Sequence, residues 1–290
     1  MGKQPQKQLY AATLLEQFIE EGKYPELKKT EKKTKKFTSS LRSRLETSES
    51  KRHVFDEFNL VGRFTAKKDF STDYIGLNEY LYDIGLLFHV VEIDNELIQK
   101  NELYLDMIQD FKFPDTFYIK PNLNKAGKDL IKLPSSFVIS EEMSLNEIVK
   151  ELALLKPRVK ELTYEYKKLK NRLIKFPEIQ QLFGKPKKLR KPIPHKYGSL
   201  SVVANQPKYD IQAIYDYLGE WMLIEYGKPN SELLEQFILN GTITKKEIDQ
   251  FRTIVDIRLD FSVMSIEDES KLLSMLDNKT RHATANRLGA

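Results

Sequence analysis

The sequence predicts a mainly α fold, with helical domains, a long kinked heptad helix at about 144–176 and a small β element near 115–140. Three observations predict this class. Apolar residues recur at spacings of three and four, without a break, along the heptad helix. Two Ser/Thr-x-x-Glu capping boxes mark helix starts. Further apolar stripes at helical spacing lie in segments 74–110 and 208–277.

The heptad pattern places ten apolar side chains on one seam of a single helix. Ser144 and Glu147 form the capping box that starts it, and Pro177 with Gly184 closes it. Pro157 removes one backbone hydrogen bond at a cost of about 3 kcal/mol. Burial of ten seam side chains, at roughly 1.5–3 kcal/mol each, outweighs that cost, so we expect a kinked but continuous helix. The seam consists of Leu145, Ile148, Leu152, Leu155, Val159, Leu162, Tyr166, Leu169, Leu173 and Phe176.

The seam has two interpretations. It can mediate self-association as a coiled coil, or it can pack internally against residues 74–110. The aromatic residues Tyr166 and Phe176 suit a globular helical core at least as well as a two-stranded zipper.

The segments before the heptad helix are predicted in order. A first helix covers residues 8–21, and the basic segment from Lys28 to Arg52, with few apolar residues, is either a disordered arm or a surface helix docked on a partner. Helices are predicted for residues 74–91, with a buried strand as the alternative for 86–91, and for residues 96–110. Two β-prone runs, 116–120 and 136–140, predict a hairpin or small sheet.

After the heptad helix, the prolines of residues 184–197 predict an extended linker. Residues 208–277 are predicted to be all-helical: a helix stop at Asn240-Gly241, a capping box of Thr244 and Glu247 opening a helix through Leu259, and a last helix capped by Ser265. Residues 279–290 are expected to be a loose tail. The predicted domains are 1–52 (N-terminal helix and basic arm), 53–183 (helical, with a small β insertion and the heptad helix), 184–199 (basic Pro-rich linker) and 200–290 (C-terminal helical domain).

Composition excludes several function classes. The 290-residue chain contains no cysteine, which rules out disulfides, cysteine-ligated metals and cysteine nucleophiles. It has no apolar run of the ~18–20 residues that a membrane span needs, and a polar N-terminus without a secretory signal. We therefore expect a cytoplasmic protein without a membrane partner, with the interior of a virion as the alternative location.

Charge is concentrated in two basic segments beside an acidic body. Residues 22–52 hold eleven Lys/Arg against four Glu, and residues 184–197 hold six Lys/Arg and no acid. Such clusters bind phosphates, bind an acidic partner, or dock on the protein's own acidic surface. The candidate binding residues are Lys28, Lys29, Lys32, Lys33, Lys35, Lys36, Arg42, Arg44, Lys185, Lys187, Lys188, Arg190 and Lys191.

Patterns that would indicate catalysis are weak. The four histidines, His53, His89, His195 and His282, lie far apart with no metal-binding spacing. Arg190 and His195 have a spacing found in some helical ribonucleases, but prolines separate them. Residues 231–258 also allow a helix–turn–helix. The fragments that would suit a metal-dependent nuclease are Glu92, Asp94, Asp115, Glu165 and Lys167.

The leading hypothesis is a non-enzymatic, oligomeric interaction protein, such as a phage or mobile-element factor that binds or blocks a host complex or scaffolds an assembly. A nucleic-acid-binding protein that uses the two basic segments is the alternative, and a metal-dependent nuclease-like enzyme is the second alternative. We expect no catalytic residues, no metal and no cofactor. The expected partners are a protein, a second copy of the chain, or DNA or RNA.

Overall fold

The computed structural model describes residues 10–288, apart from the side chains of 279, 280 and 282–288, and the chain divides into two compact units. Unit 1 comprises Met1–Arg63 and Asp115–Asn205, and unit 2 comprises Phe64–Pro114 and Gln206–Ala290. The segment 53–183, predicted as one domain, contributes to both units. Residues 184–199, predicted as a linker, lie within unit 1.

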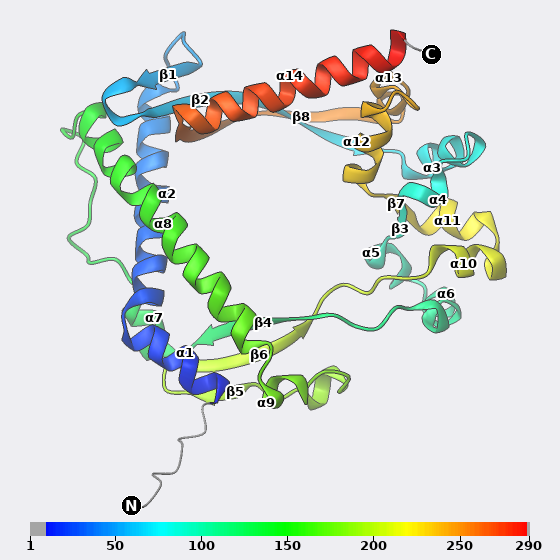
Figure 1. The fold of residues 1–290 in the computed structure, drawn as a ribbon, viewed down its shortest axis with the longest axis horizontal. Coiled ribbons are helices and arrows are strands. Elements are labelled where there is room, and N and C mark those ends of the chain that lie inside the picture. Colours follow the sequence, from blue (N-terminus) through cyan, green and yellow to red (C-terminus); the bar gives the residue numbers. More distant parts are fainter. Residues whose placement is uncertain (1–9, 289–290) are drawn as a thin grey trace, which may run out of the picture. The chain divides into compact units, whose positions relative to one another are not determined.

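The mainly α prediction was wrong. The structure is 55% helical and 21% strand, with three small antiparallel sheets. Their strand orders are β1-β2-β8, β3-β7 and β4-β6-β5. The most extensive β structure is not the predicted one near 115–140. It is formed by β2 (Leu60–Thr72) and β8 (Arg252–Ser265), labelled in Figure 1.

Unit 1 combines helices and strands from both of its chain segments. The first segment holds α1 (Ala11–Glu20), α2 (Lys23–Leu45), β1 (Arg52–Phe55), a 3-10 turn (Asp56–Phe58) and the start of β2. The second segment holds β4 (Phe117–Leu123), α7 (Lys125–Leu130), α8 (Leu145–Leu173), α9 (Pro177–Gln180), a 3-10 turn (Lys187–Leu189), β5 (Ile193–His195) and β6 (Gly198–Ala204).

The predicted heptad helix is present as α8, which ends at Leu173 rather than at about residue 176. Helix α8 starts at the capping box, in which the Ser144 hydroxyl accepts from the Glu147 N–H while the Glu147 carboxylate accepts from the Ser144 N–H. Pro157 lies inside it on an exposed position, and the helix continues to Leu173. Every seam residue is buried or half-buried.

The helix that packs along α8 is α2 (Figure 1), a partner that the sequence did not predict. The last seam residues, Leu169 and Leu173, lie in a cluster with α1 and the sheet. The buried side chains of α2 include Leu27, Phe37, Leu41 and Leu45. Residues 28–52, predicted as an arm or partner-bound helix, therefore begin with a helix docked on the chain's own α8. Because α2 is rich in lysine, its few apolar residues did not predict a packed helix. They are enough for α2 to pack in the protein because α8 provides an apolar surface opposite them.

Polar contacts fix the pairing of α2 with α8. The Arg158 guanidinium on α8 donates to both carboxylate oxygens of Glu26 on α2, over 2.6 and 2.8 Å, and to Glu161 over 2.7 Å. This bidentate geometry fixes the direction of the contact as well as strengthening it. The hydrogen bond from Arg158 lowers the pKa of Glu26. The ring of the seam residue Tyr166 packs 5.3 Å from that of Tyr24.

The second basic segment contributes a strand to the unit 1 sheet. Strand β5 pairs with β6, which pairs along its whole length with β4, from Phe117↔Ala204 to Leu123↔Gly198. The predicted strand at 116–120 is thus confirmed, whereas 136–140 forms a loop. Prolines exclude a helix here, but they are compatible with an edge strand such as β5.

Unit 2 combines mostly short helices with strands from both of its chain segments. Its first segment holds the end of β2, α3 (Tyr74–Asp83), α4 (Leu87–Val90), β3 (Val91–Ile93), α5 (Asn95–Ile98), α6 (Glu102–Met107) and a 3-10 turn (Gln109–Phe111). Its second holds α10 (Ile211–Leu218), α11 (Glu220–Tyr226), β7 (Gly227–Pro229), α12 (Ser231–Leu239), α13 (Lys245–Asp249), β8 and α14 (Ile266–Leu288).

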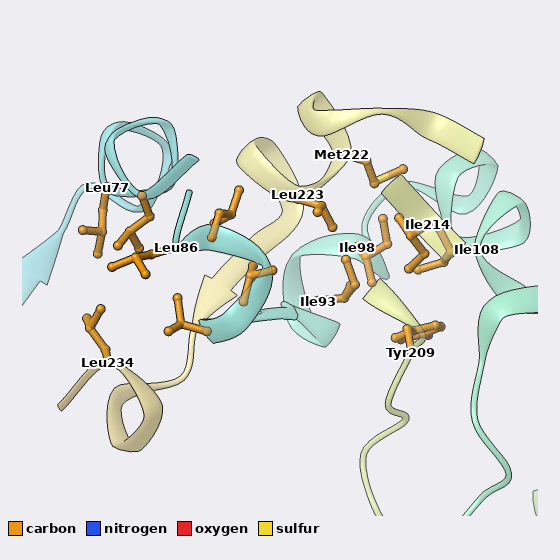
Figure 2. Packing of buried hydrophobic residues seen from close by; sticks show 14 of the residues in the cluster. Leu77, Leu86, Ile93, Ile98, Ile108, Tyr209, Ile214, Met222, Leu223 and Leu234 are labelled. Atoms are coloured by element: carbon orange, nitrogen blue, oxygen red, sulfur yellow. The ribbon is translucent and has the colours of Figure 1, made fainter. Parts of the chain in front are cut away.

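A single apolar cluster fills the centre of unit 2 (Figure 2). It joins Leu77 and Leu86 to Leu223 and Leu234 from the other chain segment. One polar residue is buried among them: the Asn78 amide donates to the carbonyls of Leu223, Ile224 and Gly227. These carbonyls lie at the C-terminal end of α11, where the last carbonyls of a helix have no N–H donor within the helix. The Asn78 amide supplies a donor for them.

The all-helical prediction for residues 208–277 was also wrong. The Thr244–Glu247 capping box is present, but its helix ends at Asp249 and residues 252–265 form β8. The apolar residues Val255 and Leu259 fit helical spacing, yet with Ile257, Phe261 and Val263 they alternate at the period of a strand. Ser265 caps the last helix as predicted, and that helix extends through Leu288, where a loose tail was expected.

Candidate interaction surfaces

The first basic cluster is largely used within unit 1. It holds the loop 131–143 against α2. The Lys32 ammonium donates to the Ile131 carbonyl over 2.7 Å, and Arg44 donates to the carbonyls of Ser140 (2.9 Å) and Met143. These cations therefore have a structural role.

An aromatic contact completes the attachment of this loop. The Phe137 ring meets Phe37 edge-on at 5.7 Å, and the ammonium groups of Lys33 and Lys36 lie 5.4 and 5.5 Å from its centre. Cations over an aromatic face stabilise such a contact. Most of the predicted cluster thus docks on the chain itself.

The remaining predicted residues of the first cluster lie along the same helix. Lys28 pairs with Glu31 (2.8 Å), and Arg42 with Glu46 (3.7 Å). Lys29 is half-buried and Lys35 exposed, and neither has an ion-pair partner among residues 10–288. Unlike the other cations of α2 named above, these two also have no hydrogen bond or ring contact of their side chains among the described residues.

The second basic cluster has a different environment. Lys185, Lys187, Lys188 and Lys191 are all exposed around the 3-10 turn, with Leu189 exposed between them. Within the described part of the chain no carboxylate forms an ion pair with these four lysines. Their charge is therefore available to solvent and ligands. We call these four residues the lysine turn.

Arg190 anchors the lysine turn to the sheet. Its guanidinium lies over the Phe117 ring at 5.2 Å, and Phe117 stacks on Phe183 with 4.6 Å between ring centres. The neighbouring cation Lys196 pairs with Glu20 over 2.7 Å, which raises the pKa of the Lys196 ammonium to about 12. Arg190 and Lys196 are thus held, and the four lysines between Gly184 and Pro192 project outward.

The sequence did not indicate an apolar surface on unit 2. On β8, alternate residues Val255, Ile257, Leu259, Phe261 and Val263 share one face. The Phe64 ring of β2 contacts Phe261 at 4.6 Å and so belongs to the same face. The opposite face carries the charged residues Asp256, Arg258 and Asp260, together with the exposed Ile254.

Burial along this apolar face changes from one end to the other. Val263 is buried, whereas Val255 and Ile257 are 63% and 58% exposed. Helix α14, which follows β8 directly and contacts it (Figure 1), adds Leu272, Leu273, Met275 and Leu276, all exposed. We call Val255, Ile257 and these four residues the apolar ribbon surface. The alternation of apolar residues at every second position of 253–263 is a signal in the sequence that could have identified the part of this surface on β8.

The residues considered for catalysis lie in unrelated surroundings. His53 is on β1, and His195, on β5, accepts through Nδ1 from the Tyr197 N–H, with burial lowering its pKa. His89 is on α4, and the side chain of His282 lies outside the described residues.

The proposed nuclease fragments have structural contacts or exposed positions. Glu92 accepts from Asn230, Asp94 caps α5, and Glu165 pairs with Lys23. Among the side chains that the structure describes, no group of three or more histidines or carboxylates is arranged to hold a metal ion. Asp115 and Lys167 are exposed.

No helix within residues 10–288 has the length and apolar character required to cross a membrane. No family model, curated protein or solved structure matches the chain. Any functional inference therefore depends on the surfaces described above.

Proposed function

We propose that the protein is a non-enzymatic interaction protein that self-associates through the apolar ribbon surface. The observation that carries this proposal is the exposure of Val255 and Ile257 on the apolar face of β8, together with four exposed apolar residues on α14, the helix that contacts β8. We further propose that it acts in the cytoplasm as a phage or mobile-element factor that binds or blocks a host complex or scaffolds an assembly.

Two physical arguments support self-association. Contiguous exposed apolar patches on soluble proteins mark interaction sites, whereas scattered apolar residues do not. A two-stranded ribbon is also marginally stable alone, and burial of one face stabilises it. Residues are exposed on both strands, from Thr65 to Lys68 on β2 and from Thr253 to Arg258 on β8. A partner surface would bury the apolar side chains of this part of the ribbon.

Ile257→Glu is expected to weaken self-association more than tenfold, because a charge replaces an apolar side chain that the interface would bury. The measurement is the dissociation constant from sedimentation equilibrium of the full chain. Thr65→Glu, on the polar face of β2, is the matched control and should leave the constant unchanged. Equal constants for wild type and Ile257→Glu would count against the apolar ribbon surface.

The lysine turn supports a second candidate function, nucleic-acid binding. Four exposed lysines without carboxylate partners in the described chain offer phosphate contacts that depend on salt rather than sequence. By contrast, neutralising Lys32, Lys33 and Lys36 would also loosen the loop 131–143, so those residues are a poor test of binding.

The triple variant Lys187→Gln/Lys188→Gln/Lys191→Gln is expected to reduce the slope of log affinity against log salt by about 0.9 per lysine on duplex DNA. Fluorescence anisotropy with a labelled duplex measures this slope. Lys29→Gln/Lys35→Gln serves as the control for charge loss elsewhere. An unchanged slope in the triple variant would remove the lysine turn as a nucleic-acid site.

A further inference from the structure

Strand β8 is the edge strand of its sheet, because the strand order is β1-β2-β8. An edge strand presents backbone donors and acceptors to any strand that can lie beside it. Residues 253–258 are exposed without interruption. The N–H of Ile257 donates to the Asp256 carboxylate over 2.8 Å, a local bond that a neighbouring strand would replace.

The side chains of β8 are compatible with a second β8 in antiparallel orientation. Residues directly opposite each other share one face of a sheet, so the apolar face must continue as apolar and the polar face as polar. In an antiparallel pair, the numbers of any two opposite residues add to the same total. That total must be even, so that odd-numbered residues of the apolar face lie opposite odd-numbered residues. The charges Asp256, Arg258 and Asp260 then select among the pairings with an even total.

A pairing centred on Arg258 would place arginine opposite arginine and Asp256 opposite Asp260, which is repulsive. A pairing centred on Ile257 places Asp256 opposite Arg258 of the second copy, twice by symmetry, and Val255 opposite Leu259. It also coincides with the exposed stretch, whereas a centre at Leu259 would bring the buried Val263 into the contact.

We propose that two copies of the chain pair through β8, antiparallel and centred on Ile257, so that two Asp256–Arg258 contacts and one continuous apolar face join them. This rests on the self-association proposed above and places its contact at the edge of the apolar ribbon surface, where Ile257 lies opposite its copy and Val255 lies opposite Leu259. An interface that matches a patch to itself about a two-fold axis is the common form for homodimers.

Single cysteines test the register, since the natural chain has none. Ile257→Cys is expected to give a covalent dimer with a short bis-maleimide, because the two thiols would face each other across the axis. Thr253→Cys is the control: its two copies would lie eight residues apart along the strands, about 26 Å, beyond the reagent. Cross-linking of both variants, or of Thr253→Cys alone, would overturn the register.

Charge exchange tests the proposed contacts. Arg258→Asp is expected to weaken the dimer at least tenfold, and adding Asp256→Arg should restore it, because the intermolecular pairs are re-formed with reversed signs. Arg258 also lies 3.5 Å from both Asp69 and Asp260 within the chain, and the double variant cannot restore these two contacts. Rescue therefore reports the intermolecular pairs, and its absence contradicts them.

The outcomes separate the two proposals. A wild-type chain that is monomeric at every concentration overturns both. A wild-type dimer, weakened by Ile257→Glu but without the Ile257→Cys cross-link, overturns the β8 register and leaves self-association through the apolar ribbon surface.

Discussion

Leu152→Ala is expected to destabilise the protein by about 2–5 kcal/mol, the range for deleting a buried leucine side chain. Leu152 is fully buried on the heptad seam, where α8 packs against α2. The truncation leaves a cavity, because a helix continuous from Leu145 to Leu173 cannot collapse locally around one residue.

Urea unfolding followed by circular dichroism measures this loss. Leu154→Ala is the matched control, since Leu154 lies two residues away on the same helix and is 64% exposed. Its unfolding free energy should change by no more than about 0.5 kcal/mol. Equal losses of unfolding free energy in Leu152→Ala and Leu154→Ala would contradict the stabilising role of the buried seam.

Gly227→Ala is expected to destabilise unit 2 by about 3 kcal/mol, at the upper end for overpacking. A Cβ atom here would lie 2.0 Å from the Leu223 carbonyl oxygen and 2.5 Å from a methyl group of Val91. The first obstacle is backbone and cannot rotate away. Moving it would also disturb the hydrogen bond from Asn78 to the Gly227 carbonyl.

Thermal unfolding of Gly227→Ala should therefore show a clearly lower midpoint. Glu225→Ala, on the exposed side of α11, should match the wild type. A Gly227→Ala protein as stable as the wild type would show that β7 does not approach α11 so closely.

Local signals in the sequence predicted local structure well. The capping boxes at Ser144 and Thr244 and the stop at Asn240-Gly241 all lie at helix ends, because they act through hydrogen bonds to nearby backbone atoms. The continuity of α8 through Pro157 followed from weighing seam burial against one lost hydrogen bond.

Two kinds of prediction from the sequence were wrong: the choice between helix and strand where the apolar spacing fits both, and the choice of which segments pack together. Val255 and Leu259 suit a helix as well as a strand, and only pairing with β2 decides between them. The seam pattern says that α8 packs against something, but not that the lysine-rich α2 is its partner. Nor could charge counts show that Lys32 and Arg44 hold a loop while the lysine turn stays exposed.

The most direct test of self-association is the mass of the wild-type chain in solution, measured by sedimentation velocity across a wide range of concentrations. We expect a species of 34.0 kDa at low concentration that converts to one of twice that mass as concentration rises. A mass that stays at 34.0 kDa up to the highest concentration would contradict self-association through the apolar ribbon surface.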